Sequence, residues 1–197
     1  EEAAEIYEDV LKKFPQNKNA INGLKFLYGS TVPRRLRNQD PPVDKITPIT
    51  KLLNHGKLQH ALNALELLLS EFPGSSILYN LHGIIKGRLA LPKAAIISFK
   101  KALHIKPDYI EAQYNLGTTL KQQGNLEEAL SAFGKAVSLK PDYAAAWNNI
   151  GVTLLEQGKF IEAIDAFNRL LVIKPDYAES FFNLGVAYQG CDKHDAA

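Results

Sequence analysis

The chain has 197 residues, of which 46% are hydrophobic and 22% charged, and its formal net charge is only +2. So small a charge does not favour nucleic acid or anionic lipid as a partner. No apolar run approaches the roughly 18 residues of a membrane span, and no signal peptide is visible. The single cysteine, Cys191, excludes an intramolecular disulfide and fits a reducing compartment, so we expect a cytoplasmic location.

The first part of the chain is expected to be helical but irregular. Residues 1–29 keep the spacing of a helical pair, as a partial or degenerate repeat. Residues 30–43 then break the spacing and are expected to form a linker or a shortened helix. They contain the only basic cluster, Arg34, Arg35 and Arg37. Because no aromatic residues are interleaved with it, this cluster favours a solvated linker over nucleic-acid recognition.

From there on, four columns of residues recur every 34 positions. They are the prolines 73, 107, 141 and 175, the glycines 83, 117, 151 and 185, the alanines 61, 95, 129 and 163, and the large apolar residues Leu65, Phe99, Phe133 and Phe167. A fixed period of this length indicates a stacked repeat protein. We expect an array over 44–197, with units near 42–75, 76–109, 110–143, 144–177 and a partial unit 178–197.

Each unit is expected to contain two helices. In the unit at 144–177, Trp147 and Gly151 belong to the apolar stripe of a first helix. Gly158 can take a positive φ and end that helix, and Pro175 stops the second one. Gly151 and Ala163 are expected where the paired helices come closest, so a large residue at Gly151 should cost about 1–3 kcal/mol by overpacking.

A Lys-Pro-Asp-Tyr motif ends three of the units, at 106–109, 140–143 and 174–177. The preferred interpretation is structural, as a helix stop, a cap and an aromatic packing between units. Asp108, Asp142 and Asp176 are expected to cap the following helices. Glu111 and Glu179 would complete capping boxes, whereas Ala145 stands at the equivalent place in the third unit.

These residues together resemble the tetratricopeptide repeat (TPR), a helix–turn–helix unit of 34 residues. The resemblance rests on Trp147, Ile150, Gly151, Leu154, Ala163, Phe167 and Pro175, and it covers roughly residues 42–197. It implies an all-α fold, a right-handed α-solenoid superhelix of antiparallel helix pairs. The unit at 76 departs from the pattern, with His82 where Leu is usual, Lys86 in the Leu/Tyr column and Ala90 in the turn-glycine column.

Asparagine recurs at the same step, two residues before each glycine, as Asn115, Asn149 and Asn183. In this family the first helices line the concave face, where stacked amides can bind the backbone of an extended peptide. The column resembles the asparagine ladder in the TPR arrays of O-GlcNAc transferases, and it stops at Leu81. The alternative is that each asparagine only satisfies a neighbouring repeat.

Residues around this column extend the candidate peptide-binding surface. They are Asn80, Tyr114, Asn148 and Phe182, one position earlier in each unit, and Thr118 one turn later. Tyr114 and Phe182 could provide apolar pockets, or they could be partly buried against the adjacent repeat. The columns that would carry the carboxylate clamp of chaperone-binding TPR domains lack its Lys and Asn pairing, so that mode of binding is rejected.

No catalytic or metal site is predicted. Cys191 and His194 supply two strong ligands where structural zinc takes four, and Asp192 falls in the turn-glycine column. The other histidines share no ligand spacing, and no nucleophile-elbow, HExxH, Walker or dinucleotide motif occurs. No cofactor is expected.

The predicted function is therefore that of a non-catalytic scaffold binding a protein or an extended peptide in a concave groove. The alternative is a docking region of a larger enzyme, because the array resembles those of bacterial TPR-transferase proteins, whose partner domains are glycosyltransferases or sulfotransferases. The lack of Met and the position of Ala197 in the alanine column predict a fragment of a longer protein. An unfinished last unit could also drive self-association.

Overall fold

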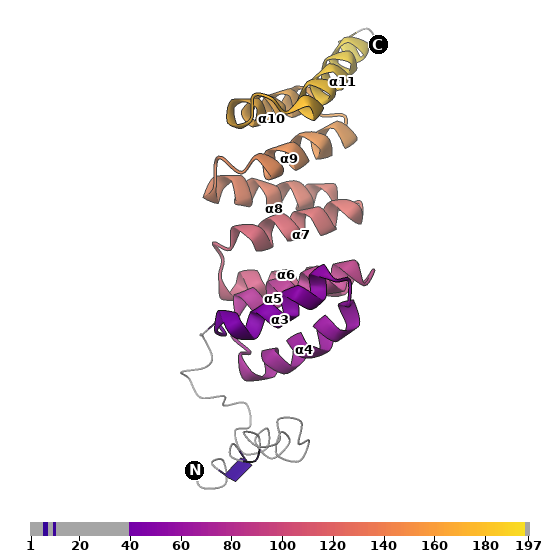
Figure 1. Cartoon of the computed structure of the whole chain (residues 1–197). Coiled ribbons are helices and arrows are strands. Elements are labelled where there is room, and N and C mark those ends of the chain that lie inside the picture. The colour runs from indigo at the N-terminus through magenta and orange to yellow at the C-terminus, as the bar shows by residue number, and fades with distance from the viewer. Residues whose placement is uncertain (1–5, 8–9, 11–39, 196–197) are drawn as a thin grey trace.

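The computed structural model describes residues 6–7, 10 and 40–195 (Figure 1). The helical pair expected over 1–29 and most of the linker expected over 30–43 lie outside the described residues. The described chain forms one stack of helices, from α3 and α4 at the indigo end to α11 at the yellow end.

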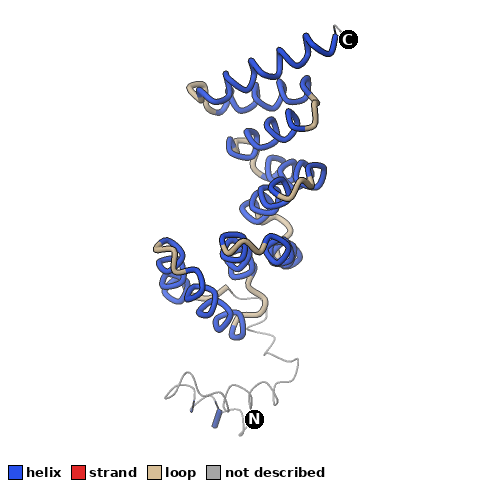
Figure 2. Tube along the Cα trace, turned by 90° about the vertical axis from the view of Figure 1, so that its right-hand side faces the viewer, coloured by secondary structure: helices blue, strands red, loops and turns tan. Residues whose placement is uncertain are grey.

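The described helices succeed one another in antiparallel pairs with short connections, and Figure 2 shows the pairs in tandem. Within 40–195 there is no strand, so the all-α fold class is confirmed. The helices are α3 (Val43–Asn54), α4 (Leu58–Glu71), α5 (Ser76–Arg88), α6 (Pro92–Ile105), α7 (Ile110–Gln122), α8 (Leu126–Leu139), α9 (Ala144–Glu156), α10 (Phe160–Ile173) and α11 (Ala178–Asp195).

The first helices form the inner row of the stack from α5 onward. Each helix packs on the next one in the chain, and α5 also contacts α7, α7 contacts α9, and α9 contacts α11. The second helices α4, α6, α8 and α10 make no comparable contacts with one another in the described part of the chain. A stack that is closer on one side curves toward that side, so α5, α7, α9 and α11 line the inner face.

The glycine and phenylalanine columns meet inside three of the helix pairs, α5/α6, α7/α8 and α9/α10. A Cβ atom on Gly151 would lie 2.5 Å from Cε1 of Phe167, and the same substitution at Gly83 or Gly117 would meet the ring of Phe99 or Phe133 at 2.5 or 2.7 Å. The close approach predicted at Gly151 is therefore confirmed, but the nearest group on the facing helix is the ring of Phe167 rather than Ala163. Phe133 and Phe167 are fully buried, so their rings have no free space to move into.

The turns between paired helices use a left-handed residue in one column. Gly56, Gly124 and Gly158 have φ of 71°, 75° and 71°, which confirms the turn predicted at Gly158. Ala90 occupies that column in the second pair and has a φ of 58°. A Cβ atom in this region is sterically unfavourable, whereas glycine adopts it freely.

We therefore expect Ala90→Gly to stabilise the protein. Relief of the left-handed strain, about 1–2 kcal/mol, should exceed the added entropy of glycine in the unfolded chain, about 0.4–1 kcal/mol. Gly124→Ala is the matched control and should destabilise by a similar amount. Denaturation midpoints measure both changes, and an Ala90→Gly variant less stable than the parent would contradict this account.

The caps predicted at Asp108 and Asp142 are wrong. The N-cap residues of α7 and α9 are Tyr109 and Tyr143, and neither helix has a side-chain cap. The reason is the turn before each helix, in which the Tyr109 N–H donates to the Lys106 carbonyl at 3.2 Å and the Tyr143 N–H donates to the Lys140 carbonyl at 3.0 Å. Proline presets the second position of such a turn, which leaves tyrosine at the cap.

The turn expected at Asp192 is also wrong. The helix α11 continues through Cys191 and Asp192 to Asp195. Asp192 stands in the column of Gly56, Ala90, Gly124 and Gly158, but it lies inside a continuous helix. Near this end Gly190 lies against the ring of Phe160, where an added Cβ would be too close to that ring.

Candidate functional site

The asparagine column lies on the inner row of helices, where it bridges neighbouring units. Asn115 on α7 donates from Nδ2 to Asn80 Oδ1 on α5 at 3.0 Å. The Asn80 side chain is buried and donates in turn to the Tyr109 hydroxyl at 3.3 Å. On α9, Asn149 donates from Nδ2 to the Tyr114 hydroxyl of α7 at 3.1 Å. These amino groups therefore tie consecutive first helices together.

Asn183, the last asparagine of the column, does not form a hydrogen bond to the preceding first helix, although a donor and an acceptor for such a bond are present. The Nδ2 atom of Asn183 and the Oδ1 atom of Asn148 are both buried and without a hydrogen-bond partner. They are 35 residues apart, the separation of Asn80 from Asn115 and of Tyr114 from Asn149. The donor on α11 and the acceptor on α9 thus stand at equivalent positions.

The hydrogen bonds between units use the amino groups of Asn115 and Asn149 and leave the side-chain oxygen of each amide as an acceptor. The Oδ1 atoms of Asn115 and Asn149 accept no hydrogen bond from any described residue, and neither is among the buried atoms that lack a partner. Both oxygens therefore reach solvent. With each amino group held by the preceding unit, the oxygen of the same amide has a fixed direction.

Of the other predicted site residues, Tyr114 and Thr118 contact their own stack of helices, whereas Phe182 is exposed to solvent. The ring of Tyr114 packs on Tyr143, with the centroids 5.1 Å apart, while the Thr118 hydroxyl donates to the Tyr114 carbonyl of its own helix at 3.0 Å. Phe182 on α11 is 72% exposed, and Val186 one turn later is 39% exposed. The structure thus joins Asn80, Tyr114, Asn115 and Asn149 by hydrogen bonds, and leaves Phe182 open to solvent.

The sequence analysis did not connect Tyr109 with this site. Its hydroxyl accepts from Asn80, and burial raises its pKa, so it stays protonated. The Lys-Pro-Asp-Tyr motif contained the necessary pattern, because its tyrosine recurs just before the first helix of each following unit. The motif is confirmed as a helix stop with aromatic packing between units, since Tyr143 lies against Tyr114.

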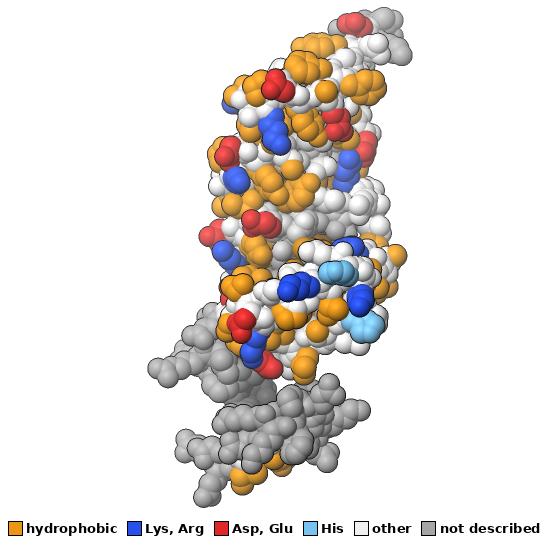
Figure 3. All heavy atoms as spheres, in the orientation of Figure 1, with side chains coloured by type: hydrophobic (Ala, Val, Ile, Leu, Met, Phe, Trp, Pro, Cys, Tyr) orange, Lys and Arg blue, Asp and Glu red, His pale blue; other side chains and the backbone are white. Residues whose placement is uncertain are grey.

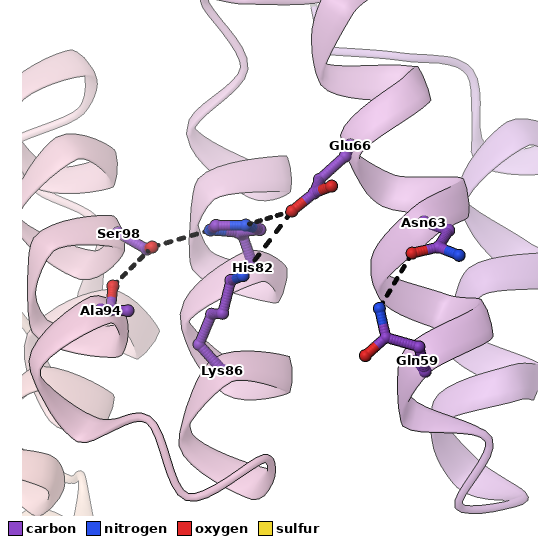
Figure 4. A network of polar contacts seen from close by, with 7 residues as sticks. All are labelled: Gln59, Asn63, Glu66, His82, Lys86, Ala94 and Ser98. Atoms are coloured by element: carbon purple, nitrogen blue, oxygen red, sulfur yellow. Dashed lines mark hydrogen bonds and ion pairs between the residues drawn. The ribbon is translucent and has the colours of Figure 1, made fainter.

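His82, the departure from the repeat pattern, forms a polar link between α4, α5 and α6 (Figure 4). Its Nδ1 lies 2.8 Å from Ser98 Oγ, which itself donates to the Ala94 carbonyl. Its Nε2 lies 3.7 Å from Glu66, whose carboxylate also pairs with Lys86 at 3.6 Å. Burial, followed by the charge of Lys86, lowers the pKa of His82, although hydrogen bonding to Glu66 opposes this shift.

This Ser–His–Glu arrangement does not have the geometry of a hydrolytic site. Ser98 is only 4% exposed, and its hydroxyl also lies within hydrogen-bond distance, 2.9 Å, of the Ala94 carbonyl of its own helix. A nucleophile must reach the substrate and lose its proton to the neighbouring base. The network therefore has a packing role.

Charged groups are mixed over the described surface. Figure 3 shows acidic and basic side chains interspersed with hydrophobic ones on the visible face. On α7, Lys121 pairs with Glu156 of α9 at 3.2 Å. Among the described residues, no three His, Cys, Asp or Glu side chains are grouped so as to hold a metal ion. None of the described helices combines the length and apolar character needed to cross a membrane.

Comparison with known proteins shows which repeat family and which solved structures these helix pairs are similar to. Residues 114–188 match the family model of the tetratricopeptide repeat. The crystal structure of MamA protein is 25% identical with a TM-score of 0.71, and the match covers 78% of this chain and 84% of that one. No curated protein matches the chain in sequence.

Two further structures show the same fold at lower identity. The first is YrrB, described as a TPR protein with an unusual peptide-binding site, at 21% identity and a TM-score of 0.62, covering 91% of this chain and 80% of that one. The second is the first TPR of Spaghetti (RPAP3) bound to the HSP90 peptide SRMEEVD, at 19% identity and a TM-score of 0.56, covering 60% and 96%.

Proposed function

We propose that this chain, a tetratricopeptide-repeat protein, is a non-catalytic interaction module that binds an extended peptide or partner segment along the inner row α5, α7, α9 and α11. The observation that carries the proposal is the pair of solvent-reaching oxygens on Asn115 and Asn149, whose amino groups are held by the preceding units. Peptide binding by YrrB and by the first TPR of Spaghetti supports the same use of this fold.

An extended peptide suits such a row of acceptors. Its backbone N–H groups point alternately to either side, so every second one can donate toward the same row. Because the asparagine amides are already fixed by the bridges between units, less side-chain freedom is lost on binding. Recognition through the ligand backbone does not depend on the ligand's sequence.

The α11 end of the row offers apolar contacts. Phe182 and Val186 are exposed one helical turn apart. Lys121 of α7 is already paired with Glu156 of α9, the first helix next to α11. These groups favour an apolar side chain of the ligand over an acidic one at this end of the row.

Replacing Asn115, Asn149 and Asn183 together by Ala tests this function. The probe is a linear peptide selected from a displayed random library against the parent protein. At about 0.5–1.5 kcal/mol for each lost hydrogen bond, binding should weaken at least about tenfold. The matched control is Asn168→Ala on the outer helix α10, where the side chain is exposed and no effect is expected.

A second variant separates binding from packing. Tyr114→Phe removes the hydroxyl that accepts from Asn149 but keeps the oxygen of Asn149, so it should lower stability more than affinity. If the triple variant keeps its helicity and binds as tightly as the parent protein, the groove proposal is wrong. Loss of helicity in the triple variant would assign the column to packing alone.

We also propose that the chain self-associates through α11. An added Cβ on Gly185 would meet nothing within 4 Å, whereas the glycines of the same column in three complete pairs each lie against a phenylalanine ring. On the same face, Phe181 and Tyr188 are 58% and 54% exposed. In an antiparallel pair of α11 helices, Phe181 of each copy can cover Gly185 of the other, as an isologous contact requires.

Light scattering as a function of concentration measures this association. The mass should rise with concentration and fall back to that of a monomer in Phe181→Ser/Tyr188→Ser. Val172→Ser on α10 is the control, because this residue is 82% exposed on another helix and should leave association unchanged. A constant monomer mass for the parent protein would refute the contact.

A further inference from the structure

A pocket of about 500 Å³ lies between α5, α6 and the connection before α5. Four of its lining residues are apolar or aromatic and three are basic: Pro73, Tyr79, Ile97, Ile105, Lys100, Lys101 and His104. No acidic residue and no member of the asparagine column is among them. The hollow is largely open to solvent, so it can receive a side chain at the surface but does not enclose a ligand.

The apolar part of the pocket is open to solvent. Ile97 is 59% exposed and Ile105 38% exposed, although both belong to α6, whose Ala95, Phe99 and Ala102 are buried. Isoleucine on the outer side of a second helix does not contribute to the core of the stack. Together with Pro73 and Tyr79, the two isoleucines form a contiguous apolar surface with charged residues at its edge, the arrangement in which exposed apolar area marks a binding site.

The cations of the pocket are only weakly neutralised. Lys101 Nζ lies 5.4 Å from the centroid of the Tyr79 ring, which directs the ammonium group across the pocket. Lys100 lies 3.5 Å from Glu128, but both side chains are more than half exposed, so this pair contributes little. His104 has no acidic partner within the described part of the chain.

The same columns carry different residues in the other units, so the repeat does not require this combination. The positions equivalent to Ile97, Lys100, Lys101 and His104 hold Ser131, Gly134, Lys135 and Ser138 on α8, Asp165, Asn168, Arg169 and Val172 on α10, and Asn63, Glu66, Leu67 and Ser70 on α4. Only α6 combines two lysines, a histidine and an exposed isoleucine.

We infer that this pocket binds an acidic segment of a partner protein through an apolar anchor residue. The anchor fits against Ile97, Ile105 and Tyr79, while flanking carboxylates face Lys100 and Lys101. Such charge complementarity favours acidic partners and makes binding sensitive to salt. The site is separate from the inner row of asparagines, so it can be occupied together with the proposed groove.

Fluorescent peptides of defined composition test the site. The first alternates Asp and Leu, the second has Ser in place of Asp, and the third has Ser in place of Leu. The Asp/Leu peptide should bind the parent protein at least about tenfold more tightly than either of the others, because both the anchor and the charges are needed. Its affinity should fall as salt is raised.

Two variants are expected to disrupt this binding. Lys100→Glu/Lys101→Glu should lower the affinity for the Asp/Leu peptide about tenfold or more, because the new carboxylates repel those of the peptide. Ile97→Ser, which keeps all the charges, should weaken it as well. Lys135→Glu is the matched control, because Lys135 occupies on α8 the column of Lys101 and should have no effect. In the triple asparagine variant the remaining binding of the Asp/Leu peptide should still be lost when Lys100→Glu/Lys101→Glu is added, which separates failure of this site from failure of the groove.

Several results would overturn the inference. The Asp/Ser peptide could bind as tightly as the Asp/Leu peptide, which would indicate charge attraction without a pocket. Lys135→Glu could weaken binding as much as the α6 variants do. Single-stranded RNA or anionic vesicles could bind through Lys100 and Lys101 in the absence of peptide binding, and the partner class would then be wrong.

Discussion

Gly151→Leu should destabilise the protein by about 1–3 kcal/mol, the typical cost of overpacking a well-packed core. A Cβ atom at this position already comes within 2.5 Å of the Phe167 ring, and that ring is fully buried. Neither helix of the pair can move away without disturbing its other neighbours. Thermal or chemical denaturation measures the loss, which corresponds to about 2–4 °C per kcal/mol for a chain of this size.

Gly185→Leu is the matched control because it lies in the same column. A Cβ atom there meets nothing of its own chain within 4 Å, so at concentrations where the protein is monomeric the leucine causes no clash. Leucine also favours the helix over glycine, and the variant should gain up to about 1 kcal/mol. Equal destabilisation at Gly151 and Gly185 would show that the glycine column acts through the backbone and not through close contact with phenylalanine.

Phe167→Ala should have the largest effect on stability, a loss of about 3–5 kcal/mol. The ring is fully buried between α9 and α10 and belongs to the cluster that runs from α6 to α11. Its removal leaves a cavity against Gly151, which has no side chain to fill it. Because each unit is stabilised by its neighbours, α11 should lose stability as well.

A matched control and a double variant give this prediction its sharpest test. Phe182→Ala removes the same ring from a side chain that is 72% exposed, and it should change stability by no more than about 0.5 kcal/mol. In Gly151→Leu/Phe167→Ala the leucine can occupy the space of the ring, so the loss should be smaller than the sum of the single losses. Strict additivity would mean that the two residues do not share one contact.

The helix pairs could be predicted from the sequence because each column has a local physical cause. Glycine permits the turn at Gly158, proline ends the second helices, and the spacing of apolar residues selects the buried stripe. The two errors have different origins. The Asp192 turn was inferred from its place in the turn-glycine column. The aspartate caps were inferred from the capping-box spacing of Asp108 and Glu111, but the turn before each helix leaves tyrosine at the cap.

The candidate site could be predicted only in part. The recurrence of Asn115, Asn149 and Asn183 drew attention to the inner row, and the sequence left open whether they serve a ligand or a neighbouring repeat. The structure assigns the amino groups of Asn115 and Asn149 to the neighbouring repeat and leaves their oxygens free of bonds within the described residues. Which end of an amide is engaged depends on a partner 35 residues away, and no local pattern contains that information.

The sequence by itself determined the period, the helix pairs and the close approach of the paired helices at the glycine column, because these follow from the residue types that recur at each step. Only the tertiary structure decided which helices form the inner row, how Tyr109 joins the asparagine column, and that Tyr79, Ile97 and Lys101 surround one pocket. The physical reason is that binding surfaces in a solenoid form between units, where side chains from separate helices meet.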